Sequence, residues 1–130
     1  MEGLQNKVAI ITGSATSIGA IVAEKFINAG VKVIIADIAV TEGKALAQKL
    51  GSDARFVETD VTSDDDLKKS VAIAVENFGR LDFIVNTACT YLDHGMESTS
   101  EEFLKSINVN AAGGFMLSQF ATPHLKESKG

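Results

Sequence analysis

The feature that most constrains the fold is a strand–turn–helix pattern at the start of the chain. A mostly apolar run at residues 7–12 leads straight into a turn of small residues at 13–19 and then into an apolar helix expected over about 17–29. This order is typical of a βαβ unit in which N–H groups at the helix start bind a phosphate. Gly13 and Gly19 allow a tight turn and a close approach of backbone to that anion. The pattern therefore favours nucleotide binding over a purely structural turn.

Strands and helices alternate along the rest of the chain, which predicts an α/β fold with a doubly wound, Rossmann-like parallel sheet. Ser63 and Thr99 are expected helix caps, Thr41 is a third, and a break is expected near Pro123. Right-handed crossovers give the strand order 3-2-1-4 in a single dinucleotide-binding domain over residues 1–130. The further strands are expected at 31–37, 55–59 and 81–86, and the further helices at 41–50, 64–78, 100–107 and 109–126.

An acidic residue ends the second expected strand. Asp37 comes 18 residues after Gly19, where a carboxylate can accept both hydrogen bonds from the adenosine ribose diol of a dinucleotide. Neither Thr16 nor Ile38 supplies a cation that could neutralise a 2′-phosphate, so the pattern predicts NAD rather than NADP. The alternative is a loop or helix-capping aspartate, which is common in turns.

Composition excludes several classes of partner. The net charge of −5 argues against nucleic acid, which needs a basic face. No apolar run approaches the roughly 20 residues of a membrane span, and the polar N-terminus does not read as a signal peptide. Cys89 is the only cysteine, so we expect a reducing cytoplasm and a small buried thiol. His124 has no companion ligand, so no metal site is expected.

Four motifs together resemble the short-chain dehydrogenase/reductase superfamily over nearly the whole chain. They are Thr12-Gly13-x-x-x-Ser17-Ile18-Gly19, Asp60-Val61, Asn86-Thr87-Ala88-Cys89 and the Asn110 of Ile107-Asn108-Val109-Asn110. The resemblance implies hydride transfer between the nicotinamide of NAD and an alcohol or carbonyl substrate, with Asn110 in the catalytic site. It implies that the cofactor contacts are Gly13, Ser14, Thr16, Ser17, Ile18, Gly19, Asp37, Ile38, Asp60, Val61, Asn86, Thr87, Ala88 and Val109. The hydroxyls of the serines and of Thr16 are expected at the pyrophosphate.

The chain departs from the family pattern at three places. Ser17 replaces the middle glycine of the turn, which is tolerable if its φ stays negative. Thr87 and Cys89 replace an asparagine and a glycine after the fourth strand, so the usual hydrogen bonds there are only partly assured. The family's serine and its Tyr-x-x-x-Lys lie beyond residue 130. We therefore expect the nucleotide-binding half of an enzyme, inactive by itself.

Other interpretations of the same residues stay open. Tyr91 and His94 form an imaginable acid–base pair, but with no evident partner to tune them we expect solvated loop residues. Asn110 could relay protons, or it could be a helix-interior group bonded to backbone. A non-catalytic nucleotide-binding module, or an interaction subunit whose open strand edge another polypeptide completes, is the alternative function. The apolar face of the last helix is expected in the core and, by resemblance, partly in the interface of a dimer or tetramer.

Overall fold

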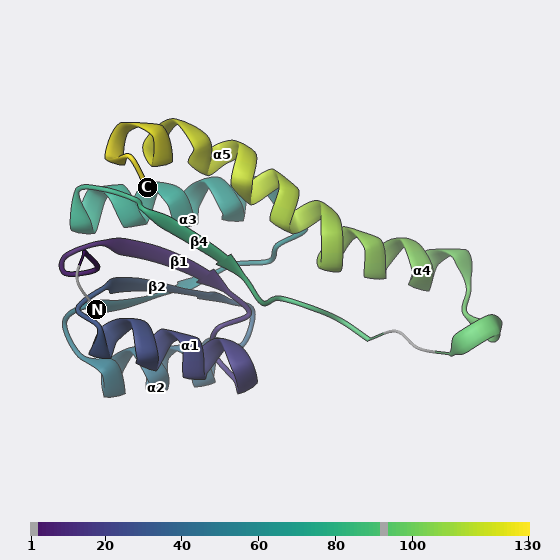
Figure 1. Cartoon of the computed structure of the whole chain (residues 1–130). Helices are drawn as coiled ribbons and strands as arrows, with labels where there is room; N and C mark the ends of the chain where they lie inside the picture. The colour runs from purple at the N-terminus through teal and green to yellow at the C-terminus, as the bar shows by residue number, and fades with distance from the viewer. Residues whose placement is uncertain (1–2, 92–93) are drawn as a thin grey trace.

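The structure, a computed structural model, describes residues 3–91 and 94–130. Its centre is one parallel sheet in the order β3-β2-β1-β4, which confirms the predicted topology (Figure 1). The carboxyl ends of β1, β2 and β4 lie level with one another, since Thr12 pairs with both Ala36 and Asn86. The strands are β1 (Val8–Thr12), β2 (Lys32–Asp37), β3 (Ala54–Glu58) and β4 (Phe83–Asn86).

Helices cover both faces of this sheet, which explains why its central strands read as unbroken apolar runs. Successive side chains of a strand point to opposite faces. Accordingly Ile10 packs with the core under α3 and α5, and Ile11 packs with the core under α1 and α2. The covering helices are α1 (Ser17–Asn28), α2 (Val40–Leu50), α3 (Asp64–Phe78) and α5 (Gly113–Ser128).

The helix boundaries follow local chemistry, with one error in the prediction. The Ser63 hydroxyl accepts the Asp66 N–H at the start of α3, and Thr99 forms a full capping box with Glu102. The prediction that Thr41 caps α2 is wrong, because α2 begins at Val40 with Ala39 as its N-cap. The Asp37 carboxylate accepts the Ala39 N–H at 2.9 Å, so Asp37, and not Thr41, supplies a side-chain hydrogen bond to the backbone just before α2.

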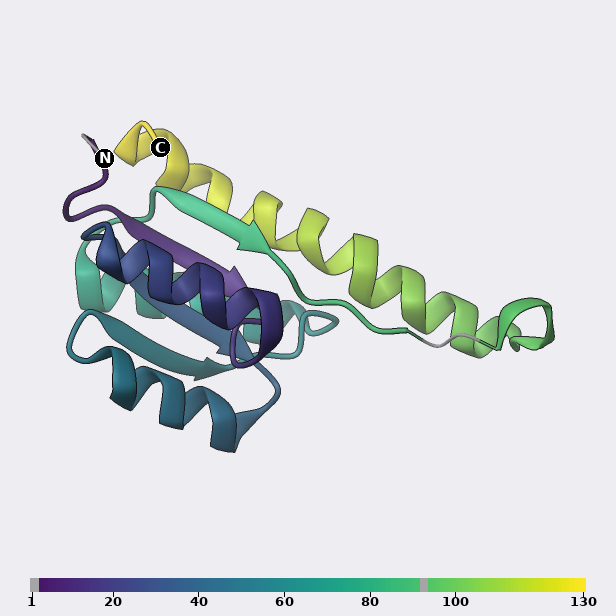
Figure 2. The same cartoon turned by 60° about the horizontal axis from the view of Figure 1, so that its bottom comes forward.

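The C-terminal helices form one continuous rod rather than two separate elements. A short 3₁₀ turn, η1 (Gly95–Glu97), precedes α4 (Ser100–Ile107), and a π-helical segment, η2 (Asn108–Ala112), joins α4 to α5. Figures 1 and 2 show that α4 projects beyond the sheet. The expected break near Pro123 is wrong, since α5 continues past it. Pro123 and Gln119 are both exposed, so water can bind the carbonyl that the proline leaves without a donor.

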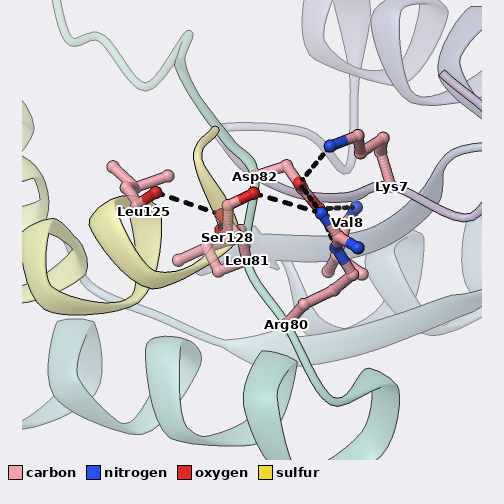
Figure 3. Close-up of polar contacts among 7 residues, drawn as sticks. All are labelled: Lys7, Val8, Arg80, Leu81, Asp82, Leu125 and Ser128. Atoms are coloured by element: carbon pink, nitrogen blue, oxygen red, sulfur yellow. Dashed lines mark hydrogen bonds and ion pairs between the residues drawn. The ribbon is translucent and has the colours of Figure 1, made fainter. Parts of the chain in front are cut away.

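A buried carboxylate holds together the end of the sheet where β1 and β4 begin. Asp82 has no exposed side-chain surface and accepts hydrogen bonds from Arg80, from Lys7 and from the Val8 N–H (Figure 3). Nearby, the Ser128 hydroxyl at the end of α5 donates to the Leu81 carbonyl. Burial by itself would raise the pKa of Asp82, but the hydrogen bonds from Arg80, Lys7 and Val8 outweigh it and lower that pKa below its usual value.

We expect Asp82→Asn to lower the free energy of unfolding by about 2–3 kcal/mol. This is less than the roughly 3–5 kcal/mol typical of breaking a fully buried ion pair, because Arg80 and Lys7 still reach water. A depressed pKa contributes stability above the unfolded-state value, near 4, which is lost as the pH falls through the folded-state pKa. Urea unfolding between about pH 2 and 7 should therefore show the difference between wild type and variant shrinking in acid. The exposed Asp53→Asn is the control, and a pH-independent difference would contradict the assignment.

Candidate functional site

A cleft of about 500 Å³ opens at the carboxyl ends of the strands, where ligands bind in open parallel sheets. The structure places at this cleft all of the predicted cofactor residues except Ser14 and Asn86. Thr59, Cys89 and Tyr91 also line it, and the sequence did not single them out as cofactor contacts. The lining residues are Gly13, Thr16, Ser17, Ile18, Gly19, Asp37, Ile38, Thr59, Asp60, Val61, Thr87, Ala88, Cys89, Tyr91 and Val109.

The glycine turn needs its glycines for space as well as for conformation. Gly13 has φ +65°, and a Cβ there would lie 2.6 Å from the backbone of Ala88. A Cβ on Gly19 would lie 2.7 Å from the Cα of Ser14 and would collide with the Gly13 carbonyl. The turn is therefore packed against itself and against the segment after β4. This packing brings the start of α1 to the wall of the cleft.

The start of α1 is arranged to receive an anion. The first N–H groups of any helix lack partners within it, and the helix dipole makes this end positive. Thr16 precedes α1 without forming a side-chain cap to it, and its side chain is exposed at the cleft. Donors at the start of α1 are thus available to a ligand such as a pyrophosphate.

Ser17 differs from the sequence-based expectation. Its φ is +51°, not negative, so a side chain occupies the left-handed region that glycine normally fills. Such a conformation costs a non-glycine residue about 1–2 kcal/mol. Ser17 is the first residue of α1 and directly follows the packed part of the turn, and its side chain lies exposed at the cleft.

We expect Ser17→Gly to raise the free energy of unfolding by about 0.5–1 kcal/mol, the relieved strain less the added entropy of an unfolded glycine. Urea unfolding measures the change. Ser52→Gly is the control, since Ser52 is also exposed but does not share the positive φ. The control should lose stability. Equal losses in the two variants would show that residue 17 carries no strain.

The structure corrects the role expected for the Ser14 hydroxyl. Ser14 is fully buried, and its hydroxyl donates to the Ile11 carbonyl and accepts from the Ala36 N–H at 3.1 Å. Both partners belong to the sheet. The side chain therefore joins β1 to β2 beneath the turn and does not reach an anion in the cleft.

Asp37 connects the glycine turn to the end of β2. One carboxylate oxygen accepts the Ala15 N–H and the other accepts the Ala39 N–H, each at 2.9 Å. Each oxygen keeps a second lone pair for a ligand. Capping and ligand binding are thus compatible here. Ile38, which follows and lines the same cleft, is 69% exposed.

The segment after β4 is attached to β1 despite its departures from the family pattern. The Thr87 N–H and the Thr87 hydroxyl both donate to the Thr12 carbonyl, and the Thr12 hydroxyl donates to the side-chain oxygen of Asn86. Thr87 therefore supplies a link between the glycine turn and β4. Asn86 does not line the cleft. A Cβ on Gly114 would lie 2.6 Å from the Asn86 amide nitrogen, which places that side chain against α5.

Cys89 and Tyr91 line the cleft and are both exposed. The prediction of a buried Cys89 is wrong, because this thiol is exposed. Tyr91 is 86% exposed, as expected for a loop tyrosine. A hydrogen bond with Cys89 raises the pKa of Tyr91. That shift is opposite to the lowered pKa that a tyrosine acting as a base near neutral pH requires.

His94 has a partner that the sequence did not reveal. Its Nδ1 lies 3.0 Å from the Glu102 carboxylate, although no carboxylate was expected beside it. The Thr99 N–H, and then His94, lower the pKa of Glu102. His94 thus pairs with Glu102 at the start of α4, whereas Tyr91 forms a hydrogen bond with Cys89, so the two side chains have different partners. Residues 3–91 and 94–130 place no three His, Cys, Asp or Glu side chains in a metal-binding group. None of the helices described there has the length and apolar character to cross a bilayer.

Asn110, on the π-helical segment η2, forms hydrogen bonds with the backbone of the segment after β4. Its side-chain amide donates to the Thr90 carbonyl at 2.9 Å and accepts from the Thr90 N–H at 2.7 Å. The Asn110 side chain is therefore bonded to backbone, as one of the two expectations had it. That backbone belongs to the segment after β4 and not to the helix that carries Asn110. Single-turn π segments are frequent at functional sites.

The family model for short chain dehydrogenases matches residues 7–130. The chain belongs to this family. It is 41% identical over 124 residues to tropinone reductase-like 1 of Erythroxylum coca, covering 92% of this chain and 46% of the relative. It is 37% identical over 126 residues to L-fucose dehydrogenase of Oryctolagus cuniculus, covering 95% of this chain and 44% of the relative.

A solved structure of the short-chain dehydrogenase fold agrees closely with this one. The 3-ketoacyl-(acyl-carrier-protein) reductase of Brucella melitensis, complexed with NADH, superposes with a TM-score of 0.89 at 30% identity. The match covers 96% of this chain and 52% of that one. The chain thus spans about half the length of the relatives that it matches.

Proposed function

We propose that this chain supplies the NAD-binding part of a dehydrogenase or reductase that moves hydride between nicotinamide and an alcohol or carbonyl carbon. The observation that carries the proposal is the cleft, where the glycine turn, the start of α1 and Asp37 meet. A pyrophosphate would bind the α1 N–H groups and the ribose diol would bind Asp37. The NADH bound to the Brucella reductase supports this choice of ligand.

The charge of the cleft favours NAD over NADP. Asp37 and Asp60 are its charged lining residues, and no lysine or arginine is among them in the described part of the chain. A 2′-phosphate on the adenosine ribose would therefore approach carboxylates with no cation nearby, which costs several kcal/mol in a partly buried site.

We propose that residues 1–130 bind the dinucleotide without turning over substrate. Tyr91 is the only tyrosine in the sequence, Gly95 stands four positions after it, and its pKa is raised rather than lowered. Asn110 positions the segment after β4 for catalysis through its bonds to Thr90. The acid that protonates the alkoxide would come from outside these residues.

The exposed apolar residues of the C-terminal rod support assembly as a homo-oligomer, a dimer or tetramer. Ile107, at the end of α4, has 46% of its surface exposed, and Phe115, at the start of α5, has 69%. A single cysteine that forms no disulfide within the chain is consistent with the cytoplasm, where we place the protein.

The test combines binding with turnover. NADH is titrated into the purified protein while its fluorescence is recorded, and its oxidation is then followed with a panel of aldehydes and ketones. We expect saturable enhancement of NADH fluorescence and no oxidation above the protein-free rate. Absence of binding would overturn the proposed function, and steady oxidation would overturn the proposed lack of turnover.

A further inference from the structure

A second cavity, of about 780 Å³, adjoins the cleft. Ile38, Asp60, Cys89 and Val109 line both hollows, so these side chains form a shared wall. The proposed function gives the second cavity no occupant. Its remaining lining residues are Thr62, Thr90, Glu101, Leu104, Lys105 and Asn108.

The shared wall lies at the adenine end of the proposed dinucleotide site, and the inference rests on that proposed function. Asp37 would hold the adenosine ribose, and Ile38 and Asp60 follow at the ends of β2 and β3. Thr62 donates both its N–H and its hydroxyl to the Oδ1 atom of Asp60, at 2.9 and 2.7 Å. The Oδ2 atom keeps its lone pairs for a ligand donor. The 6-amino group of adenine is a donor that fits this position.

One face of α4 forms the outer wall of the second cavity. Glu101, Leu104 and Lys105 of α4, with Asn108 at the start of η2, follow the i, i+3, i+4, i+7 spacing of a single helix face. Leu104 is 59% exposed and offers apolar surface to the cavity, as Ile38 does. Two carboxylates against one ammonium leave a net negative lining, which favours a neutral or cationic group over an anionic one.

We propose that this cavity accepts a substituent on the adenine 6-amino group, so that the chain binds N6-alkylated adenine dinucleotides as well as NAD. An alkyl chain would pack between Ile38 and Leu104, and a terminal ammonium would lie near Glu101. The adenine end of the site thus has room for a substituent, and Glu101 and Leu104 of α4 would select its charge and apolar character.

The test compares NAD⁺ with N6-(aminohexyl)-NAD⁺ by calorimetric titration. For the wild type we expect the two dissociation constants to agree within about threefold. Leu104→Trp fills the cavity from an exposed position and should weaken the analogue by about tenfold or more while NAD⁺ is unaffected. Phe103→Trp is the matched control, since Phe103 is also exposed on α4 but does not line the cavity.

The outcomes separate this inference from the function on which it rests. If NAD⁺ itself fails to bind, the proposed function is overturned and the inference with it. If NAD⁺ binds and the wild type rejects the analogue, the inference alone is overturned. The same holds if Leu104→Trp and Phe103→Trp affect the analogue equally.

Discussion

Replacing Gly19 with alanine is expected to abolish measurable NAD binding and to lower the free energy of unfolding by about 2–3 kcal/mol, as overpacking does in a tightly filled region. Gly19 has no positive φ, so alanine is allowed there by conformation. Space decides instead. The added Cβ would lie 2.7 Å from the Cα of Ser14 and 2.7 Å from the Thr87 hydroxyl oxygen. Because the obstacle includes backbone of the glycine turn, the turn must move and the anion site moves with it.

Gly79→Ala provides the contrast. Gly79 has φ +78° and nothing within 4 Å of an added methyl group, so alanine there adds only left-handed strain of about 1–2 kcal/mol. Calorimetric titration with NAD⁺ and urea unfolding should show full binding by Gly79→Ala and none by Gly19→Ala. Binding by Gly19→Ala within about threefold of wild type would contradict the proposed phosphate site.

Replacing Asp37 with alanine is expected to weaken NAD⁺ binding by about 100-fold, the effect of losing a charge-assisted pair of hydrogen bonds worth roughly 3 kcal/mol. NADP⁺ should lose far less, because the carboxylate repels its 2′-phosphate. The ratio of the two affinities, measured by titrating each nucleotide, should therefore approach one.

Asp37→Asn separates charge from structure. The carboxylate also accepts the Ala15 and Ala39 N–H groups, so alanine disturbs the turn as well as the ligand. Asparagine keeps one acceptor oxygen and removes the negative charge. We expect it to bind NADP⁺ more tightly than wild type and NAD⁺ less tightly. An unchanged preference in both variants would show that Asp37 does not select the cofactor.

The sequence was sufficient to predict the sheet and its order, because each strand is a local signal. The runs at 7–12 and 31–37 are apolar in their central residues, 8–11 and 33–36, since both of their faces are covered, and glycines or capping residues mark most helix ends. The joining of α4 to α5 was not predicted. The π-helical segment has no local sequence pattern of its own, and the hydrogen bonds between Asn110 and Thr90 connect residues 20 positions apart.

The same distinction holds at the candidate site. The glycine turn and Asp37 can each be recognised from a short stretch of sequence, and the structure brings both to one cleft. Ser14 and Cys89 were assigned wrongly because burial is decided by neighbours from other elements. The Ala36 N–H of β2 donates to the buried Ser14 hydroxyl, whereas the Cys89 thiol lies exposed beside Tyr91. Ser17 shows that a residue type alone does not fix φ.

The central claim, that this chain is an NAD site selected by Asp37, is tested most directly by titrating NAD⁺ and NADP⁺ into the unmodified protein in a calorimeter. The account predicts saturable binding of NAD⁺ at one site per chain and binding of NADP⁺ weaker by about 100-fold or more. Equal affinity for the two nucleotides, or heat of binding from neither, would contradict it.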